Sequence, residues 1–186
     1  SEPRLRRAIA GAASGAAAVL AAWLLTAWLL PAGVAGAAGY GPGTRGPAGG
    51  MRLEVWDARA ERVVHHRPVT AGERFTLRHV HSVTRRPVRE TYSATTDGVA
   101  MEELWFDTFG ANLPAGPERI GPVTTTFLVE DHGYRVLHHG RLMPVVPLLT
   151  GRPRVNHELL FTDGSRLRLL DLVPPSTPLE LRIAAG

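Results

Sequence analysis

The residues best suited to chemistry lie together near position 80. His79 and His81 are separated by one residue, so a β-strand would place both imidazoles on the same face. Ser82 follows directly, and Glu90 comes a few residues later. Imidazole, hydroxyl and carboxyl groups in this arrangement are found in metal sites, in nucleophilic sites and in polar pairs that fix strand register.

An antiparallel hairpin would bring these groups together. We expect strands at Arg74–Val83 and Val88–Thr95, joined by an even-numbered loop around Arg85 and Arg86. In that register, Glu90 accepts a hydrogen bond from His81 or forms an ion pair with it. The predicted cross-strand pairs are Val83 with Val88, His81 with Glu90, and His79 with Tyr92.

Two kinds of chemistry compete with a structural or binding role for this hairpin. A metal site would use His79, His81 and Glu90 as ligands, although His-x-His spacing alone is a weak signal. A hydrolase would use Ser82 beside His81, but adjacent strand residues project to opposite faces, and the chain has no G-x-S-x-G motif. The sequence therefore predicts no catalytic residue and no cofactor.

The positioning elements are predicted to be β-strands. Apolar and polar residues alternate in segments such as 74–83 and 166–169, with turn signals between them. Thr162-Asp163-Gly164-Ser165 is expected to turn a hairpin between 158–161 and 166–171, and the eleven prolines of residues 51–186 disfavour long helices there. We predict an all-β domain, either a small antiparallel sandwich or an open barrel.

Composition excludes several classes of protein. The chain has no cysteine, which removes disulfides and thiolate metal sites. All 21 basic residues are arginine, and they are interspersed with 17 acidic residues to give a net charge of +4. Nucleic-acid binding requires basic residues gathered on one face, so this function is not expected.

The chain divides into three parts. Residues 1–38 hold a basic start and an uncharged apolar run at 8–30, which predicts a transmembrane anchor with the N-terminus inside. The alternative is a cleaved signal peptide and a secreted domain. Residues 39–50 are a Gly/Pro-rich linker, and residues 51–186 form the extracytoplasmic β-domain.

Two irregular apolar segments could bind a ligand or partner. Phe109–Pro114 is either a buried corner of the fold or a recognition loop on a rigid sheet. Arg141–Val155, with three prolines, is expected to run extended along a sheet edge, where it covers the edge or recruits a partner.

Several of these motifs resemble one family. The chain is similar to the domain-of-unknown-function family 1850 in His81-Ser82-Val83, Pro87-Val88, Glu90, Tyr92, Phe109-Gly110-Ala111-Asn112-Leu113-Pro114 and Asn156-His157-Glu158-Leu159. It departs from the family at Asn112, where the pattern has glycine. Asparagine tolerates a positive φ better than other non-glycine residues, so a left-handed turn is expected to persist there.

The resemblance implies a small exported or membrane-anchored protein, often encoded beside TAXI-type TRAP transporters. The leading interpretation is a non-enzymatic domain on the outer face of the cytoplasmic membrane that assists such a transporter. The runner-up is a metal- or small-ligand-binding module, and an uncharacterised enzyme comes third. The candidate ligand- or partner-binding residues are His81, Ser82, Glu90, Tyr92, Phe109, Asn112 and Leu113.

Overall fold

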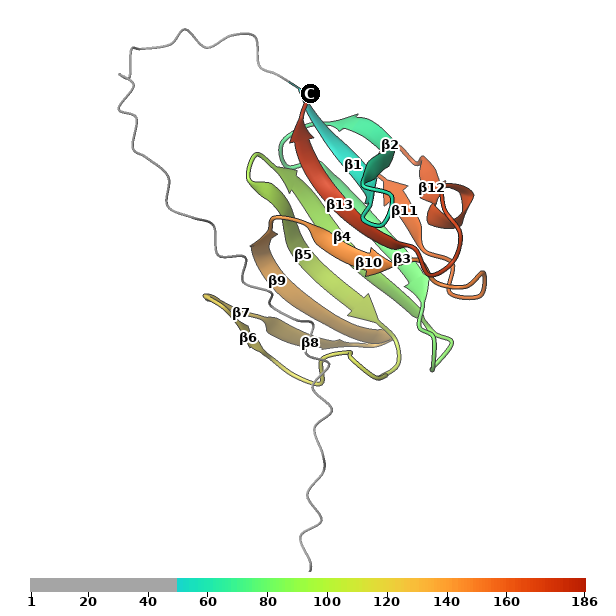
Figure 1. Cartoon of the computed structure of the whole chain (residues 1–186). Helices are drawn as coiled ribbons and strands as arrows, with labels where there is room; N and C mark the ends of the chain where they lie inside the picture. The colour runs from blue at the N-terminus through green and yellow to red at the C-terminus, as the bar shows by residue number, and fades with distance from the viewer. Residues whose placement is uncertain (1–49) are drawn as a thin grey trace, which may run out of the picture. The chain divides into compact units, whose positions relative to one another are not determined.

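A computed structural model describes residues 50–186 as two antiparallel β-sheets (Figure 1). The smaller sheet has the strand order β10 (Val146–Leu149), β13 (Pro178–Ala185), β1 (Met51–Asp57) and β2 (Arg62–Val69). The larger sheet has the order β12 (Arg166–Arg168), β11 (Glu158–Phe161), β3 (Arg74–Val80), β4 (Pro87–Thr95), β5 (Gly98–Phe106), β9 (Gly133–Met143) and β8 (Thr126–Glu130). A two-stranded ribbon, β6 (Arg119–Ile120) and β7 (Val123–Thr124), and the 3₁₀ turn η1 (Leu169–Asp171) complete the domain.

The two sheets share one hydrophobic core. Alternating side chains of β1 and β13, such as Leu53, Val55 and Leu181, are buried in the same cluster as Phe75 of β3 and Phe106 of β5. Successive strand residues point to opposite faces, so this alternation assigns one face of each sheet to the core. The period-two pattern in the sequence is thus explained by burial between the sheets.

The prediction of an all-β antiparallel domain is confirmed. Every strand pair within residues 50–186 is antiparallel, and β12 and β8 end the larger sheet without pairing with each other. The fold is therefore an open sandwich rather than a closed barrel. The hairpin of β11 and β12 forms around Thr162–Ser165 as expected, although β12 ends at Arg168. The anchor or signal segment lies outside the described residues, and no helix among residues 50–186 is long and apolar enough to span a bilayer.

The predicted register of the β3–β4 hairpin is wrong. Leu77, not His81, lies opposite Glu90, and His79 lies opposite Val88 instead of Tyr92. Strand β3 ends at Val80 because the chain turns directly after it: the N–H of Arg85 donates to the carbonyl of His81. The ring of His81 accepts from the N–H groups inside this turn, which a longer strand would have used in the ladder. The partner of Glu90 shifts by four positions; because this number is even, each side chain stays on the face that was predicted.

Strand β10 forms one edge of the smaller sheet, and its neighbour β13 ends beside the first described residue. The expectation that part of Arg141–Val155 runs along a sheet edge is confirmed, because β10 is an edge strand paired only with β13. The chain then crosses to the larger sheet, where β11 begins. At the other end of β13, the backbone N–H of Gly186 donates to the carbonyl of Gly50, so the two ends of the described domain are adjacent (Figure 1).

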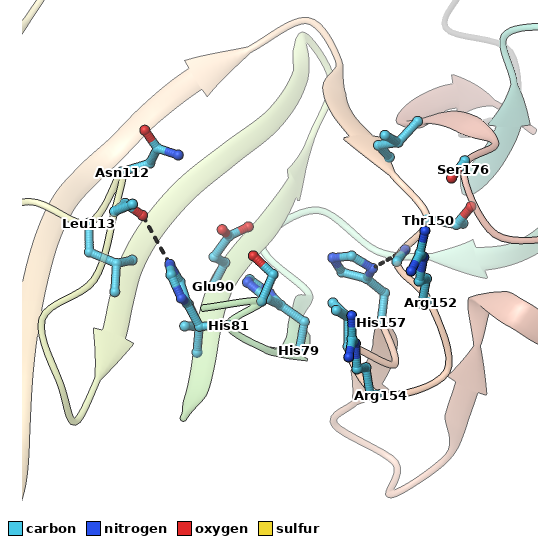
Figure 2. A pocket seen from close by; sticks show the side chains of 16 residues that line it. His79, His81, Glu90, Asn112, Leu113, Thr150, Arg152, Arg154, His157 and Ser176 are labelled. Atoms are coloured by element: carbon cyan, nitrogen blue, oxygen red, sulfur yellow. Dashed lines mark hydrogen bonds between the residues drawn. The ribbon is translucent and has the colours of Figure 1, made fainter. Parts of the chain in front are cut away.

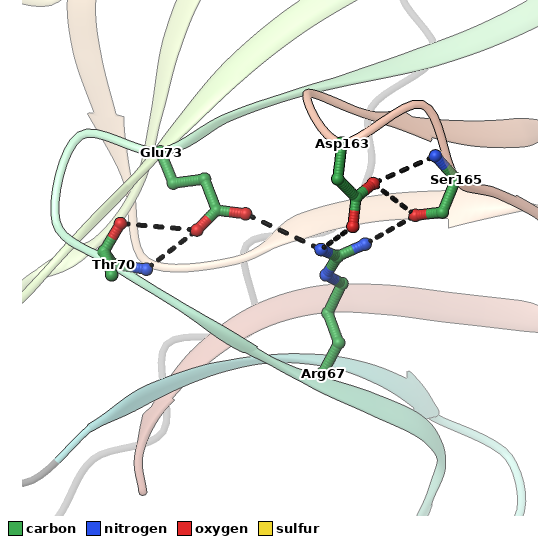
Figure 3. Close-up of polar contacts among 5 residues, drawn as sticks. All are labelled: Arg67, Thr70, Glu73, Asp163 and Ser165. Atoms are coloured by element: carbon green, nitrogen blue, oxygen red, sulfur yellow. Dashed lines mark hydrogen bonds and ion pairs between the residues drawn. The ribbon is translucent and has the colours of Figure 1, made fainter.

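Arg67 of β2 links the two sheets at one side of the domain (Figure 3). Its guanidinium donates to Asp163 at 3.0 Å and to Ser165 at 2.9 Å, both in the β11–β12 turn. It also lies 3.9 Å from the centroid of the Phe161 ring and 3.8 Å from Glu73. Hydrogen bonds from Ser165 and Arg67 lower the pKa of Asp163 to about 2, so this carboxylate is ionised near neutral pH.

We predict that Arg67→Ala lowers the free energy of unfolding by about 1–2 kcal/mol, because it removes a cation–π contact together with ion pairs. Urea denaturation followed by tryptophan fluorescence would measure the change. Arg62→Ala is the matched control, since Arg62 lies on the same strand, is exposed and has no polar side-chain partner among the described residues. Equal effects of the two substitutions would show that the Arg67 contacts add no stability.

Candidate functional site

A pocket of about 570 Å³ opens at the end of the sandwich where β3 and β10 finish (Figure 2). It lies between the β3–β4 loop, the loop after β5 and the segment that joins β10 to β11 (residues 150–157), which we call the β10–β11 crossing. The residues that line it are His79, His81, Ser82, Val88, Glu90, Ala111, Asn112, Leu113, Leu149, Thr150, Gly151, Arg152, Arg154, Val155, His157 and Ser176.

The pocket brings together most of the residues that the sequence singled out. His81, Ser82, Glu90, Asn112 and Leu113 all line it. They come from one hairpin and from the loop after β5, which are far apart along the chain. The even register shift explains why residues predicted to share a face still do so, despite the wrong pairing.

Tyr92 does not line the pocket but is hydrogen-bonded to Glu90, which does. Its side chain is 2% exposed, and its hydroxyl donates to Oε2 of Glu90 at 2.6 Å. Burial raises the pKa of Glu90, and the hydrogen bond from Tyr92 opposes that rise in part. No cationic side chain among the described residues pairs with this carboxyl group.

Phe109 does not belong to the pocket. Its ring packs against an aromatic cluster, with its centroid 4.2 Å from that of Tyr134 and 5.7 Å from that of Phe106. The two interpretations of the Phe109–Pro114 loop therefore each describe one part of it. The Phe109 end packs on the sheet, and Ala111, Asn112 and Leu113 face the pocket.

His81 holds two loops together. Nδ1 of His81 accepts from the backbone N–H of Val83 at 3.3 Å and of Thr84 at 3.2 Å. Nε2 lies 2.9 Å from the carbonyl oxygen of Ala111 (Figure 2), and since a carbonyl can only accept, Nε2 carries the proton. Both ring nitrogens are thus occupied, which fixes a single neutral tautomer.

The loop after β5 is shaped to receive this ring. A Cβ atom on Gly110 would lie 2.9 Å from Cε1 of His81 and 3.1 Å from Cγ2 of Thr84, so only glycine allows the close approach. Asn112 has φ +65°, which confirms the left-handed turn predicted at this position. These two backbone features allow the carbonyl oxygen of Ala111 to reach Nε2 of His81.

His79 and His157 form the centre of the pocket wall. Their ring centroids are 4.9 Å apart. Burial, with smaller contributions from His157 and His81, lowers the pKa of His79 to about 4, and burial also lowers the pKa of His157. Both rings are neutral at pH 7. Nδ1 of His79 is buried without a hydrogen-bond partner among the described residues.

The β10–β11 crossing supplies the site residues that the sequence analysis missed. Nδ1 of His157 accepts from the N–H of Gly151 at 3.1 Å, so its Nε2–H is free and is directed into the pocket (Figure 2). Arg152 and Arg154 are exposed, and neither guanidinium has a polar partner among residues 50–186. His157 stood in a motif shared with the family, but no local pattern showed that this crossing would face the β3–β4 hairpin.

The contacts of His81 remove it from both chemical alternatives. His81 cannot serve as a base for Ser82, because both of its ring nitrogens are bonded to backbone groups. The same bonds leave His81 without a lone pair for a metal. Within residues 50–186, no group of three or more histidine or acidic side chains is arranged to hold a metal ion.

The comparison with protein families agrees with the motifs. Residues 75–169 match the family described as Domain of unknown function (DUF1850), which covers more than half of the chain. The chain therefore belongs to this family, as its resemblance predicted. No curated protein and no solved structure shows significant similarity to the chain.

We predict that His81→Ala lowers the free energy of unfolding by about 2–3 kcal/mol, since three backbone groups lose their partner. His81→Asn is expected to cost less, because its amide oxygen can still accept from the Val83 and Thr84 N–H groups. Urea denaturation gives the energies, and ¹⁵N NMR of the wild type should show the Nε2–H tautomer. An Nδ1–H tautomer would contradict the assigned roles.

The low pKa of His79 predicts acid sensitivity. Unfolded histidine takes up a proton near pH 6.5 and folded His79 only near pH 4, so this residue lowers stability as the pH falls between these values. The slope is at most about 1.4 kcal/mol per pH unit. His79→Phe should have a shallower pH profile than the wild type in urea titrations. The contribution of Glu90 has the opposite sign but is common to both proteins, and identical profiles would refute the assignment.

Proposed function

We propose that this domain is a non-catalytic binding module that holds a small molecule in the pocket at the end of the sandwich. The observation that carries the proposal is a set of polar groups that face the pocket without partners among the described residues: the guanidinium groups of Arg152 and Arg154, Nε2–H of His157 and one carboxyl oxygen of Glu90. Among residues 50–186, Arg67 and Arg135 are paired with carboxylates, whereas Arg62, like the pocket arginines, is not; the pocket differs in gathering several such polar groups in one place. Unpaired polar groups that converge on a pocket are typical of ligand sites.

The volume and lining support binding rather than a packing defect. About 570 Å³ is within the range of small-molecule sites, and the lining combines apolar side chains such as Val88, Leu113 and Leu149 with the polar groups. The loops around the pocket are held by His81 and by the Gly151–His157 bond, so the site is formed before a ligand arrives.

The setting of this module is proposed from the sequence. The apolar run at 8–30 supports a membrane anchor, or a cleaved signal peptide, and an extracytoplasmic domain. The family's frequent association with TAXI-type TRAP transporters supports an accessory role beside such a transporter. A domain that binds a solute near the membrane would serve this role without catalysing a reaction.

We predict that filling the pocket abolishes binding. The full-length chain, purified with mild detergent, would be screened against a metabolite panel by thermal shift, since a ligand that binds only the folded state raises its melting temperature. Leu149→Trp, an exposed pocket residue, should remove every shift. Leu142→Trp is the matched control, because Leu142 is similarly exposed (50%, against 58% for Leu149) and lies outside the pocket. Shifts that survive in Leu149→Trp would place binding elsewhere.

A further inference from the structure

The charges of the pocket are divided between two sides. Arg152 and Arg154 lie on the β10–β11 crossing, and Glu90 lies on β4 of the larger sheet, with the two histidine rings near the middle (Figure 2). Among residues 50–186, none of these three charged side chains forms an ion pair, so each can interact with a ligand. This division limits the ligands that fit.

The arginine side is suited to a carboxylate. The turn that carries both arginines is fixed by bonds from the N–H groups of Val155 and Asn156 to the carbonyl of Arg152. The free Nε2–H of His157 adds a neutral donor to the same pocket. Guanidinium and imidazole N–H groups make strong hydrogen bonds to carboxylate oxygens.

The Glu90 side is suited to a cation. Oε2 already accepts from Tyr92, which leaves the other oxygen for a ligand. The neighbouring titratable groups that line the pocket are His79, His81 and His157, and none of them forms an ion pair with Glu90. A buried carboxyl group without a cationic partner is costly to ionise, and an ammonium group placed beside it would offset that cost.

We propose that the pocket selects a small zwitterion, a molecule with one carboxylate and one ammonium group. This inference rests on the proposed binding function and specifies its ligand class. The carboxylate contacts Arg152, Arg154 and His157, and the ammonium contacts Glu90. A dicarboxylate places a second negative charge against Glu90, and a simple amine leaves the arginines unpaired, so both are disfavoured.

A matched set of five-carbon probes tests the inference. Calorimetry on the full-length chain would compare 5-aminopentanoate and norvaline with pentanoate, pentylamine and glutarate. We expect one zwitterion to bind at least about tenfold more tightly than the three other probes, the size of effect that one desolvated charge pair gives. Equal or tighter binding of glutarate or pentanoate, or no binding of either zwitterion, would overturn the zwitterion assignment.

Substitutions test which side of the pocket binds the ammonium group and which side binds the carboxylate. Glu90→Gln, which conserves shape, should remove the advantage of the zwitterion over pentanoate. Arg152→Ala with Arg154→Ala should weaken every carboxylate by about tenfold or more, and Arg62→Ala should change nothing. A preference that survives Glu90→Gln would also overturn the inference.

The two proposals fail in different ways. If the metabolite panel gives shifts that Leu149→Trp removes, but no zwitterion is preferred, the pocket binds a different class of ligand. If Leu149→Trp leaves all binding intact, the pocket itself is not the site.

Discussion

Backbone groups that leave a sheet need new hydrogen-bond partners, and beside the pocket the ring of His81 supplies three of them. One imidazole accepts from the β3–β4 loop and donates to the loop after β5, so two segments some thirty residues apart are held at a fixed separation. The pocket exists because of that separation. Gly110 is part of the same arrangement, since any side chain there would displace the ring. This contact explains physically why the His81-Ser82-Val83 and Phe109–Pro114 motifs occur together.

Many strands and turns of the domain can be predicted from local sequence patterns. Alternation identified the core faces, and Asp163-Gly164 identified a hairpin turn. The β3–β4 register was not predictable in the same way, because the strand ends where a side chain competes with the ladder. A histidine within an alternating run gives no sign that its ring will bond to backbone N–H groups rather than face a partner strand. The error moved pairings along the strand without exchanging its faces, which is why the pocket residues were still grouped correctly.

The sequence analysis missed one half of the pocket for a different reason. Arg152, Arg154 and His157 lie on a segment that passes from the smaller sheet to the larger one, and such a crossing depends on sheet order rather than on local periodicity. The sequence analysis recognised an extended edge segment but could not place it opposite the β3–β4 hairpin. Prolines at 144, 147 and 153 indicated an irregular path, and only the packed sandwich shows where that path leads.

The adjacent ends of the domain lie far from its pocket. Gly50 and Gly186 meet at one end of β13, and Ser176, just before the other end, borders the pocket. An eight-residue strand is about 26 Å long, so the pocket opens roughly the length of a strand away from the point where the preceding chain joins. Gly50 and the pocket therefore lie near opposite ends of β13. A label or substitution at Gly50 or Gly186 can therefore report on the domain without touching the lining of the pocket.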